Sequence, residues 1–434
     1  ADGVAQRGGT QAIHFKALGD VVAAFLYNTP AFVFTLLANH LALFWLGWVA
    51  ISISLQQLLL FYPERPRAQL AAHKKELSAR LGEILLAAAF VLLYLQFNSA
   101  DIQQITQQLA SLTAATPILH SAAVLLTVVA LLKCAQLPLH GWLIQVVEAP
   151  TPVSALLHAG IINLGGILLL LFAPLMALSG VASTLLLIAA LFSTVLAALI
   201  MTTRVSIKVR LAWSTVAQMG LMLVEIALGL YTLALLHLLA HSCYKAYAFL
   251  HSGNAVNHYL AAQLAEPTEP CVPHWLSALL LATLFIGLTQ QLLPFRSLSS
   301  SILLLLAITV VLLPAISRAD KQRWLRIVLA SLYTFGLLAL YLAGKTLLGS
   351  IMPQATGLPV TADLFTSGMF IALFIVAVLL RYHASKPGLN RVFIWLNAGG
   401  YLDEWATRIT LKIWPYNAKT ANTVTVLAKQ ETQA

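Results

Sequence analysis

The chain has 434 residues, of which 60% are hydrophobic and only 9% are charged, and its mean hydropathy is +0.85. An ordinary soluble domain carries about 25% charged residues, so this composition excludes a typical water-soluble protein. The formal net charge of +10 could suggest a nucleic-acid-binding protein, but the positions of the basic residues give another explanation for it.

Long apolar runs recur along the whole chain. A helix needs about 20 apolar residues to cross the hydrocarbon of a bilayer, and about eleven or twelve runs approach this length. The sequence therefore predicts an all-α polytopic membrane protein. The expected spans are residues 18–38, 40–61, 79–97, 118–137, 151–173, 181–203, 208–230, 231–252, 273–294, 301–317, 326–349 and 363–382.

The basic residues gather on one side of the membrane if these spans alternate in direction. The loops on the opposite side (98–117, 174–180, 295–300 and 350–362) contain one basic residue, Arg296. This asymmetry follows the positive-inside rule and predicts that the basic loops are cytoplasmic. It accounts for the net charge without a nucleic acid. The basic side would hold Arg7, Lys16, Arg65, Arg67, Lys74, Lys75, Arg204, Arg318, Lys321, Arg323, Arg381, Lys386 and Arg391.

Changes in composition divide the chain into five regions. In order they are a polar N-terminal segment (1–17), the first helices with the basic loop FYPERPRAQLAAHKK (18–117), a core block that holds nearly every buried ionisable residue (118–253), later leucine-rich helices (254–385), and a C-terminal segment (386–434). The last region mixes Trp, Tyr, charged and apolar residues, which is typical of an interfacial amphipathic helix rather than a span.

The third span begins with Arg80 and Glu83, three residues apart and therefore on one helix face. In one interpretation Glu83 pairs with Arg80 near the helix end. In the other it faces Lys133 and switches that lysine between its charged and neutral states.

Lys133 and Pro138 follow the uncharged run 118–132. An ionisable residue within a span costs roughly 2.5–3.5 kcal/mol to insert and indicates a functional site. Because a low-dielectric environment disfavours the charged form, such a lysine can exchange protons. Pro138 removes a backbone donor and should break the helix, and the freed groups then need protein or water partners. The alternative is a lysine that snorkels to the interface.

His158 lies in the first turns of the next apolar helix, after Pro150 and Pro152. Alone it could be a hydrogen-bonded core histidine, but the neighbouring proline break makes it a candidate relay residue. Lys208 opens a later helix, where a lysine normally anchors the basic side. Glu225, near the other end of that helix, is a weaker candidate for a proton exit.

His237, His241 and Lys245 form the clearest pattern, because their i, i+4, i+8 spacing places them on one helix face. Two histidines at i, i+4 can bind zinc, but no glutamate follows the first, and a lysine one turn on would repel a cation. We therefore predict no metal site. The stripe fits a hydrogen-bonded proton wire, or polar groups that join helices.

No cofactor is predicted in this chain. The cysteines have neither metal-ligand nor disulfide spacing, and the sequence contains no phosphate-binding loop, no dinucleotide fingerprint and no ligand set for iron–sulfur. The cysteines are Cys134, Cys243 and Cys271.

These stretches resemble the antiporter-like membrane subunits of respiratory complex I and of multisubunit cation/proton antiporters. KCAQLPLHGWLIQVVEAPTPVSALLHA is similar to the most diagnostic motif of that family, and IKVRLAWSTVAQMGLM and LHLLAHSCYKAYAFL to the two that follow. The resemblance implies two inverted helix repeats with proline-broken helices, each forming a half-channel. It also implies a proton-translocating role for Lys133, His158, Lys208, His237, His241 and Lys245.

Two family features are missing. The glutamate of a WEG-type motif appears here as Trp48-Val49, which leaves Glu83 as the carboxylate expected near Lys133. The later broken helix of the family carries an exit lysine, and the corresponding stretch 274–293 has none. The resemblance therefore does not extend to a complete second half-channel.

With these departures and the loop FYPERPRAQLAAHKK, the sequence resembles the membrane subunits of two-component inorganic-carbon pumps of the bacterial cytoplasmic (inner) membrane. That resemblance implies a large peripheral zinc protein resembling β-carbonic anhydrases as the partner, so zinc is expected there and not in this chain. Inward flow of protons or sodium ions would drive conversion of CO2 to bicarbonate.

Two other functions stay open at this point. The chain could be a proton-pumping antiporter-like subunit of an NADH dehydrogenase or of a multisubunit Na+/H+ antiporter. It could also be a non-conducting membrane anchor that recruits a soluble enzyme through the segment 386–418.

Overall fold

The computed structural model describes residues 28–60, 65–146, 149–254, 260, 270–292, 297–318, 322–350, 352–353, 360–383 and 386–415. Within these ranges the regular structure is helical, apart from an isolated β-bridge between His40 and Asp101. Three expectations lie wholly or mostly outside the described residues: the polar segment 1–17, the loop 254–272, and the C-terminal segment from residue 416 onward.

Ten helices in the described part of the chain are long and apolar enough to cross a membrane. They are α2 (Leu41–Leu59), α3 (Pro66–Phe97), α7 with α8 (Thr151–Ala159 and Leu164–Leu171), α10 (Gly180–Thr202), α11 (Ile207–Ala227), α12 (Tyr231–Leu250), α14 (Val272–Leu292), α15 (Leu298–Ser317), α16 (Arg323–Gly349) and α17 (Val360–His383). Two shorter apolar helices, Asn28–Leu37 and α5 (Pro117–Lys133), occupy the other two predicted positions. The protein is therefore an all-α, multi-pass membrane protein, as the sequence predicts.

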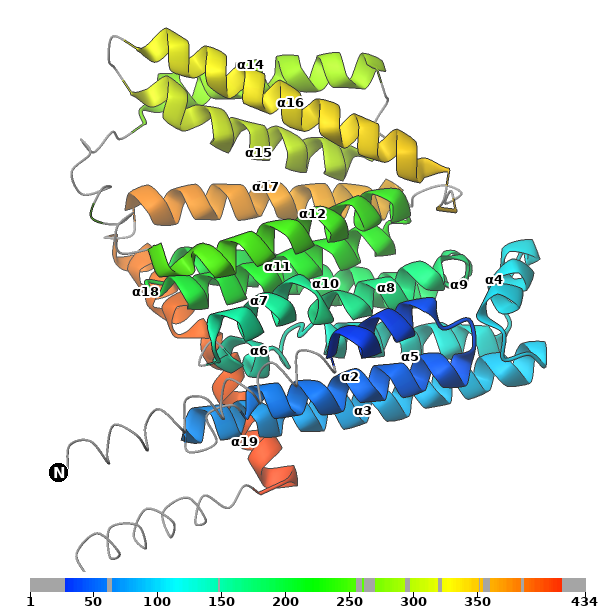
Figure 1. The fold of residues 1–434 in the computed structure, drawn as a ribbon. Coiled ribbons are helices and arrows are strands. Elements are labelled where there is room, and N and C mark those ends of the chain that lie inside the picture. The colour runs from blue at the N-terminus through cyan, green and yellow to red at the C-terminus, as the bar shows by residue number, and fades with distance from the viewer. Residues whose placement is uncertain are drawn as a thin grey trace, which may run out of the picture.

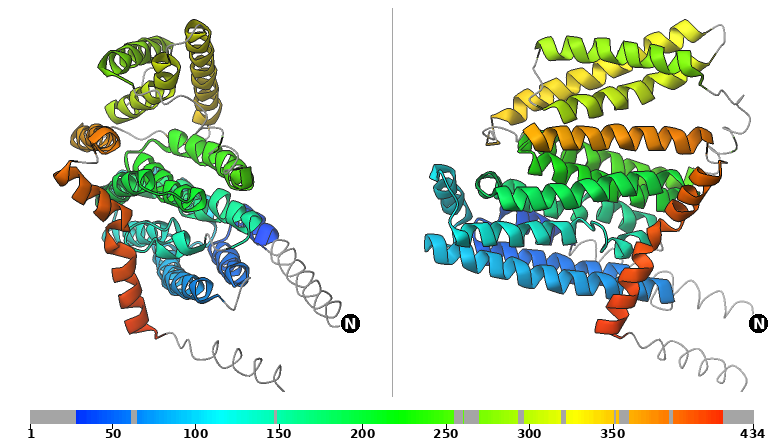
Figure 2. Two further views of the ribbon diagram at one scale, coloured as in Figure 1. Left: turned by 90° about the vertical axis from the view of Figure 1, so that its left-hand side faces the viewer. Right: turned by 180° about the vertical axis from the view of Figure 1, so that it is seen from behind.

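The spans lie side by side with their axes roughly aligned (Figure 1). Short helices connect or extend them: α4 (Ile102–Ser111), α6 (Gly141–Gln145) and α9 (Ala173–Leu178). The main buried core includes residues of α2 to α12 and of α17, and a second, smaller core forms among α14, α15 and α16. Figure 2 shows α18 (Pro387–Asn397) and α19 (Leu402–Ile413) running across one end of the bundle, as expected for a segment that does not span.

Helix α3 is longer than the sequence predicts and corrects one expectation. Lys74 and Lys75 were expected in a basic loop, but α3 begins at Pro66 and includes both, and they are only 6% and 4% exposed. Proline is favoured at the first helical position, and the Ala, Leu, Gln and Lys that follow are good helix formers. The 32 residues extend over about 48 Å, more than the roughly 30 Å of hydrocarbon.

The predicted break near Pro138 is present, and α5 already ends at Lys133. Ala135 adopts φ 49°. Its N–H donates to the Leu132 carbonyl (3.2 Å), and the N–H of Gln136 donates to the Leu131 carbonyl (3.0 Å). This pair of bonds is a Schellman cap. The left-handed residue therefore turns the chain before the proline is reached, and α6 begins only at Gly141.

A second interruption, which we did not predict, separates α7 from α8. Gly160 leads into a single 3-10 turn (Ile161–Asn163) before the helix resumes at Leu164. The Asn163 amide donates to the Ala159 carbonyl (2.8 Å) and to the Ser242 hydroxyl of α12 (2.7 Å). Both broken segments therefore find polar partners inside the protein, which an interrupted helix at membrane depth requires.

Candidate functional site

Lys133 lies at the C-terminal end of α5 above an aromatic ring. Its Nζ is 4.5 Å from the centroid of the Trp48 ring. An aromatic face attracts a cation, and the C-terminal end of a helix dipole does the same. Trp48 belongs to the Trp48-Val49 pair that stands where the resembling family has its glutamate, so a π-face lies beside the ammonium there.

A small cavity connects Lys133 to Lys75 of α3. Its volume is about 30 Å3, and Ser52, Ser78 and Trp142 line it together with the two lysines. One water needs roughly 10–15 Å3, so the cavity has room for about two. The Lys75 ammonium donates to the Ser52 carbonyl.

Sequence reasoning missed Lys75 as part of this site, although a signal was present. Ala68, Ala71 and Ala72 precede Lys75 by seven, four and three residues, so all four lie on one face of α3, and all are buried. A stripe of small residues at that spacing indicates a closely packed helix face within a membrane.

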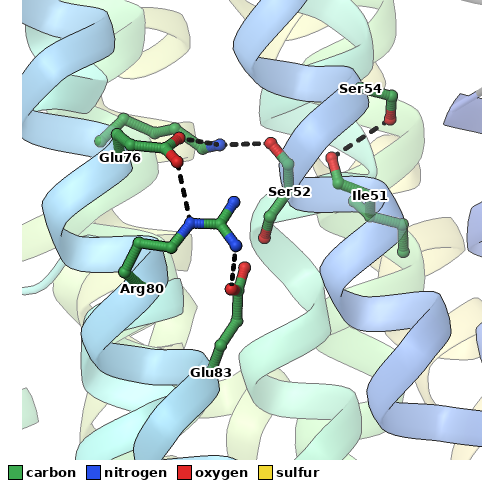
Figure 3. A network of polar contacts seen from close by, with 7 residues as sticks. Ile51, Ser52, Ser54, Glu76, Arg80 and Glu83 are labelled. Carbon is green, nitrogen blue, oxygen red and sulfur yellow. Dashed lines mark hydrogen bonds and ion pairs between the residues drawn. The ribbon is translucent and has the colours of Figure 1, made fainter.

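Glu83 pairs directly with Arg80. The Arg80 Nη1 donates to Glu83 Oε2 (2.6 Å), and the Arg80 Nε donates to Glu76 Oε1 (2.8 Å), as Figure 3 shows. Glu83 is 4% exposed. Among the described residues no hydrogen bond joins Glu83 to Lys133.

His158, Lys245 and His241 form a second group between α7, α11 and α12. The His158 Nδ1 lies 3.0 Å from the Thr215 hydroxyl, and its ring stacks on Phe249 at 4.4 Å between centroids. The Lys245 ammonium donates to the Leu211 carbonyl (2.9 Å) and to the Ser214 hydroxyl. His158 and Lys245 are fully buried and His241 is 4% exposed.

His237 extends this group by one helical turn. Its ring lies 6.4 Å from the His241 ring, as the i, i+4 spacing predicts. His237 Nδ1 is 3.1 Å from Glu225 Oε2, and its Nε2 is 2.8 Å from Gln218 Oε1. Sequence reasoning singled out Glu225 only weakly and did not identify Gln218, because both lie on the neighbouring helix α11.

Lys208 stands apart from these groups. It is partly buried at the start of α11, and the described residues give its side chain neither an ion pair nor a hydrogen bond. It lies seven residues before Thr215, about 10 Å along the helix on the same face. Lys208 therefore lies on the same face of α11 as Thr215, without a hydrogen bond or ion pair to the group around Lys245 among the described residues.

The Lys133 cavity and the histidine–lysine group are not joined by a hydrogen bond between described side chains. His158 Nε2 and both ring nitrogens of His241 are buried without a protein partner. Buried polar atoms are normally hydrogen-bonded to protein or to ordered water, so these three nitrogens are positions where water could bind.

The C-terminal segment contacts the helix break directly. Asp403 of α19 accepts from the Lys74 ammonium (2.8 Å) and from the Gln145 amide (2.9 Å). The Asp403 carboxylate also occupies the space where a side chain at Gly141 would lie. Sequence reasoning missed this contact, which joins residues more than 250 positions apart.

Arg204, in the connection between α10 and α11, also lies beside the C-terminal segment, because its guanidinium is next to Gly399. The Arg204 guanidinium lies 5.4 Å from the centroid of the Trp213 ring. Burial lowers the pKa of Arg204 from its ordinary value, and nearby Glu404 of α19 acts in the opposite direction.

The helical fold and its buried basic side chains, among them His158 and Lys245, are typical of one class of protein, the antiporter-like membrane subunits. A solved structure of the Mrp complex from Dietzia sp. DQ12-45-1b matches with a TM-score of 0.56, covering 94% of this chain and 48% of the matched chain at 19% identity. At that identity the likeness concerns the fold.

Sequence comparison identifies the family. Residues 38–284 match the family described as "NADH:quinone oxidoreductase/Mrp antiporter, TM", and this chain belongs to that family. Two relatives match over 88% of the chain. One, from Hydrogenovibrio crunogenus, is named "Probable inorganic carbon transporter subunit DabB" and is 45% identical over 74% of its length. The other, from Halothiobacillus neapolitanus, is named "Probable inorganic carbon transporter subunit DabB2" and is 36% identical over 72% of its length.

Proposed function

We propose that this chain is the ion-translocating membrane subunit of an inorganic-carbon uptake complex in the bacterial cytoplasmic membrane, with its basic loops in the cytoplasm. Protons, or sodium ions in their place, flow inward through it. This flow drives one-way conversion of CO2 to bicarbonate by a peripheral zinc-containing partner that resembles β-carbonic anhydrases. The chain itself is not an enzyme, because the chemistry takes place in the partner.

The observation that carries this proposal is the line of titratable side chains buried within apolar helices. Lys245 and His158 are fully buried, yet no carboxylate pairs with either within the described residues. Burying such groups is costly, and a site for mobile protons gives a reason for that cost. The likeness to the DabB relatives supports inorganic carbon as the coupled process.

The residues have distinct roles in this proposal. Lys133 and Lys75 exchange protons through the water in their shared cavity, and Trp48 stabilises the charged form of Lys133. His241 and His158 connect this cavity to Lys245 through water and the Thr215 hydroxyl. Glu83, near the middle of α3, and Lys208, at the basic end of α11, act on these groups through their charge.

Proton flux into vesicles tests this function. The chain would be reconstituted into vesicles with its co-purifying partner. A proton gradient would then be imposed, and the acidification of the vesicle lumen would be measured. We expect Lys133→Met and Lys245→Met to lower the initial flux by a factor on the order of 100, the usual contribution of one positioned proton-transfer group.

Lys412→Met is the matched control, because it makes the same change at an exposed lysine of α19. If both buried-lysine variants conduct like the parent, the relay is wrong. If the parent itself conducts nothing while the partner still binds, the chain is a membrane anchor.

The fold likeness to the Mrp complex favours a second candidate, an antiporter-like subunit that pumps protons under redox or sodium drive. Identifying the co-purifying subunits separates the two functions. Several hydrophilic redox subunits, or further antiporter subunits, would support this second candidate, whereas one large zinc-containing protein would support the uptake complex.

A further inference from the structure

Glu225 is a buried carboxylate to which the proposed relay has so far given no role. It lies near the end of α11 and is 6% exposed. Its two carboxylate oxygens are 3.2 and 3.1 Å from His237 Nδ1. On the other side of that ring, Nε2 faces Gln218 Oε1 at 2.8 Å. Both ring nitrogens therefore face oxygen atoms, an arrangement that suits an imidazolium, which donates from both positions.

The Glu225–His237 pair lies on the wall of the large cavity between the two helix cores. This cavity has a volume of about 400 Å3. Water needs polar partners as well as space, and at this wall Glu225, His237 and Gln218 supply them. Its other walls are almost entirely apolar, with polar groups contributed by Ser299 and Ser300 of α15 and Tyr341 of α16. The pair therefore forms the main charged feature of the described lining.

The Glu225–His237 pair lies at one end of the row that His237, His241 and Lys245 form along α12. Glu225 follows Lys208 by 17 residues, about 25 Å along α11, which is most of the hydrocarbon thickness. His241 and Lys245 follow His237 at one-turn intervals along α12 in the direction of the basic end. The pair therefore lies on the side of the membrane opposite the basic loops.

We propose that Glu225 is the proton-accepting residue that connects the buried line to water in this cavity. The inference depends on the proposed function, because it assigns one terminus of that pathway. When His237 has passed a proton toward His241, its neutral ring is left beside the carboxylate. Glu225 then takes a proton from a hydronium ion in the cavity, leaving water, and transfers it to His237 Nδ1. The carboxylate is regenerated and the ring becomes an imidazolium again.

The experiment compares Glu225→Gln, Glu225→Asp, Lys245→Met and the parent in the same vesicles with the partner present. Glutamine keeps the size of the side chain and one oxygen facing His237 but cannot carry the proton. We expect Glu225→Gln to lower the proton flux by about tenfold or more and Glu225→Asp to retain part of the flux. Glu404→Gln, the same change at an exposed position of α19, should conduct like the parent.

A hydrophobic carbodiimide gives a second measurement that does not depend on flux. The reagent modifies protonated carboxyl groups within membranes, and peptide mass analysis assigns the adduct to Glu225 or Glu83. We expect labelling at Glu225 that increases as the side opposite the basic loops is acidified. Absence of such labelling would overturn the inference even if Glu225→Gln were poorly folded.

The outcomes separate this inference from the function on which it depends. If Lys245→Met stops the flux while Glu225→Gln conducts fully, the assignment of Glu225 is wrong and the proposed function stands. If the parent and Lys245→Met behave alike, the proposed function itself fails.

Discussion

The Lys133 ammonium lies 4.5 Å above the Trp48 ring, and the buried carboxylate nearby, that of Glu83, is held by Arg80. A desolvated cation–π contact contributes about 2 kcal/mol. A direct buried ion pair is more costly to break, about 3–5 kcal/mol when one partner is lost. The ring therefore stabilises the ammonium without holding its proton as firmly as a carboxylate would.

Replacing Trp48 by leucine should lower the proton flux, because Lys133 then loses the π-face that stabilises its charged form. Trp48→Phe keeps an aromatic ring and should retain more of the flux than Trp48→Leu. The measurement is acidification of vesicles that contain the chain and its partner. Trp324→Leu is the control, since Trp324 is 78% exposed on α16. Equal flux in Trp48→Leu and the parent would contradict the role given to the ring.

Ala135 ends helix α5 in a left-handed backbone conformation. It holds φ 49° in the cap that ends α5, a conformation that costs a non-glycine residue roughly 1–2 kcal/mol. Glycine removes that cost but loses more backbone entropy on folding. Ala135→Gly should therefore raise the free energy of unfolding by about 0.5–1 kcal/mol, as measured by denaturant unfolding in detergent.

Ala88→Gly is a control for which the opposite change in stability is expected. Ala88 is exposed within the interior of α3, where glycine should lower stability by about 1 kcal/mol. If Ala135→Gly also lowers stability, the left-handed cap is not the conformation that ends α5.

At the scale of elements, Asp403 is the carboxylate through which the C-terminal helix α19 contacts the helix break. Asp403 accepts from Lys74 and Gln145, and Lys74 is only 6% exposed. A buried ammonium without a partner is costly, so Lys74 depends on Asp403 of a segment far along the chain. Movement of α19 would therefore change the packing and hydrogen bonding at Gly141 and Gln145, next to the break.

Asp403→Ala should release α19, because it leaves the Lys74 ammonium buried and unpaired. We expect a loss of stability of about 1–2 kcal/mol, less than for a fully buried pair because Asp403 is 30% exposed. Limited proteolysis of the folded protein should then cut within α19 faster than in the parent.

The double variant Asp403→Ala with Lys74→Met removes both charges and should recover most of the lost stability. Such a double-mutant cycle isolates the energy of the pair. Additive losses in the double variant would show that the two side chains do not act together.

At the scale of the whole molecule, basic residues and the C-terminal segment share one end of the bundle. Helices α18 and α19 cross that end (Figure 2), and the α5–α6 break meets them there through Asp403. The short helix α4 connects α3 to α5 at their other ends. The two ends of the bundle therefore differ, and the positive-inside rule predicts that the basic end is cytoplasmic.

Labelling with a membrane-impermeant maleimide tests this orientation. In a background with serine at Cys243 and Cys271, Ser111→Cys at the end of α4 should react in intact cells. Asn390→Cys on α18 should react only after the cells are made permeable. Both positions are exposed, and the remaining Cys134 is buried. The reverse pattern would invert the orientation and with it the direction proposed for ion flow.

Some of the site could be predicted from the sequence and some could not. The stripe of His237, His241 and Lys245 follows from helix periodicity, and the break near Pro138 follows from a proline beside a lysine in an apolar run. Lys75 was misplaced because charge and hydropathy assigned it to a loop. The stripe of Ala68, Ala71 and Ala72 on the same helix face was the available sequence signal that Lys75 is buried.

By itself the sequence determined that this is a multi-pass helical membrane protein, where its spans lie, and which helix carries an aligned row of titratable groups. These properties depend on hydropathy and on spacings of three, four or seven residues, which are local. Only the tertiary structure decided that Trp48 lies under Lys133, that Glu225 meets His237, and that Asp403 reaches Lys74. Each of these contacts joins different helices, so its geometry depends on how the helices pack and not on the order of residues within either one.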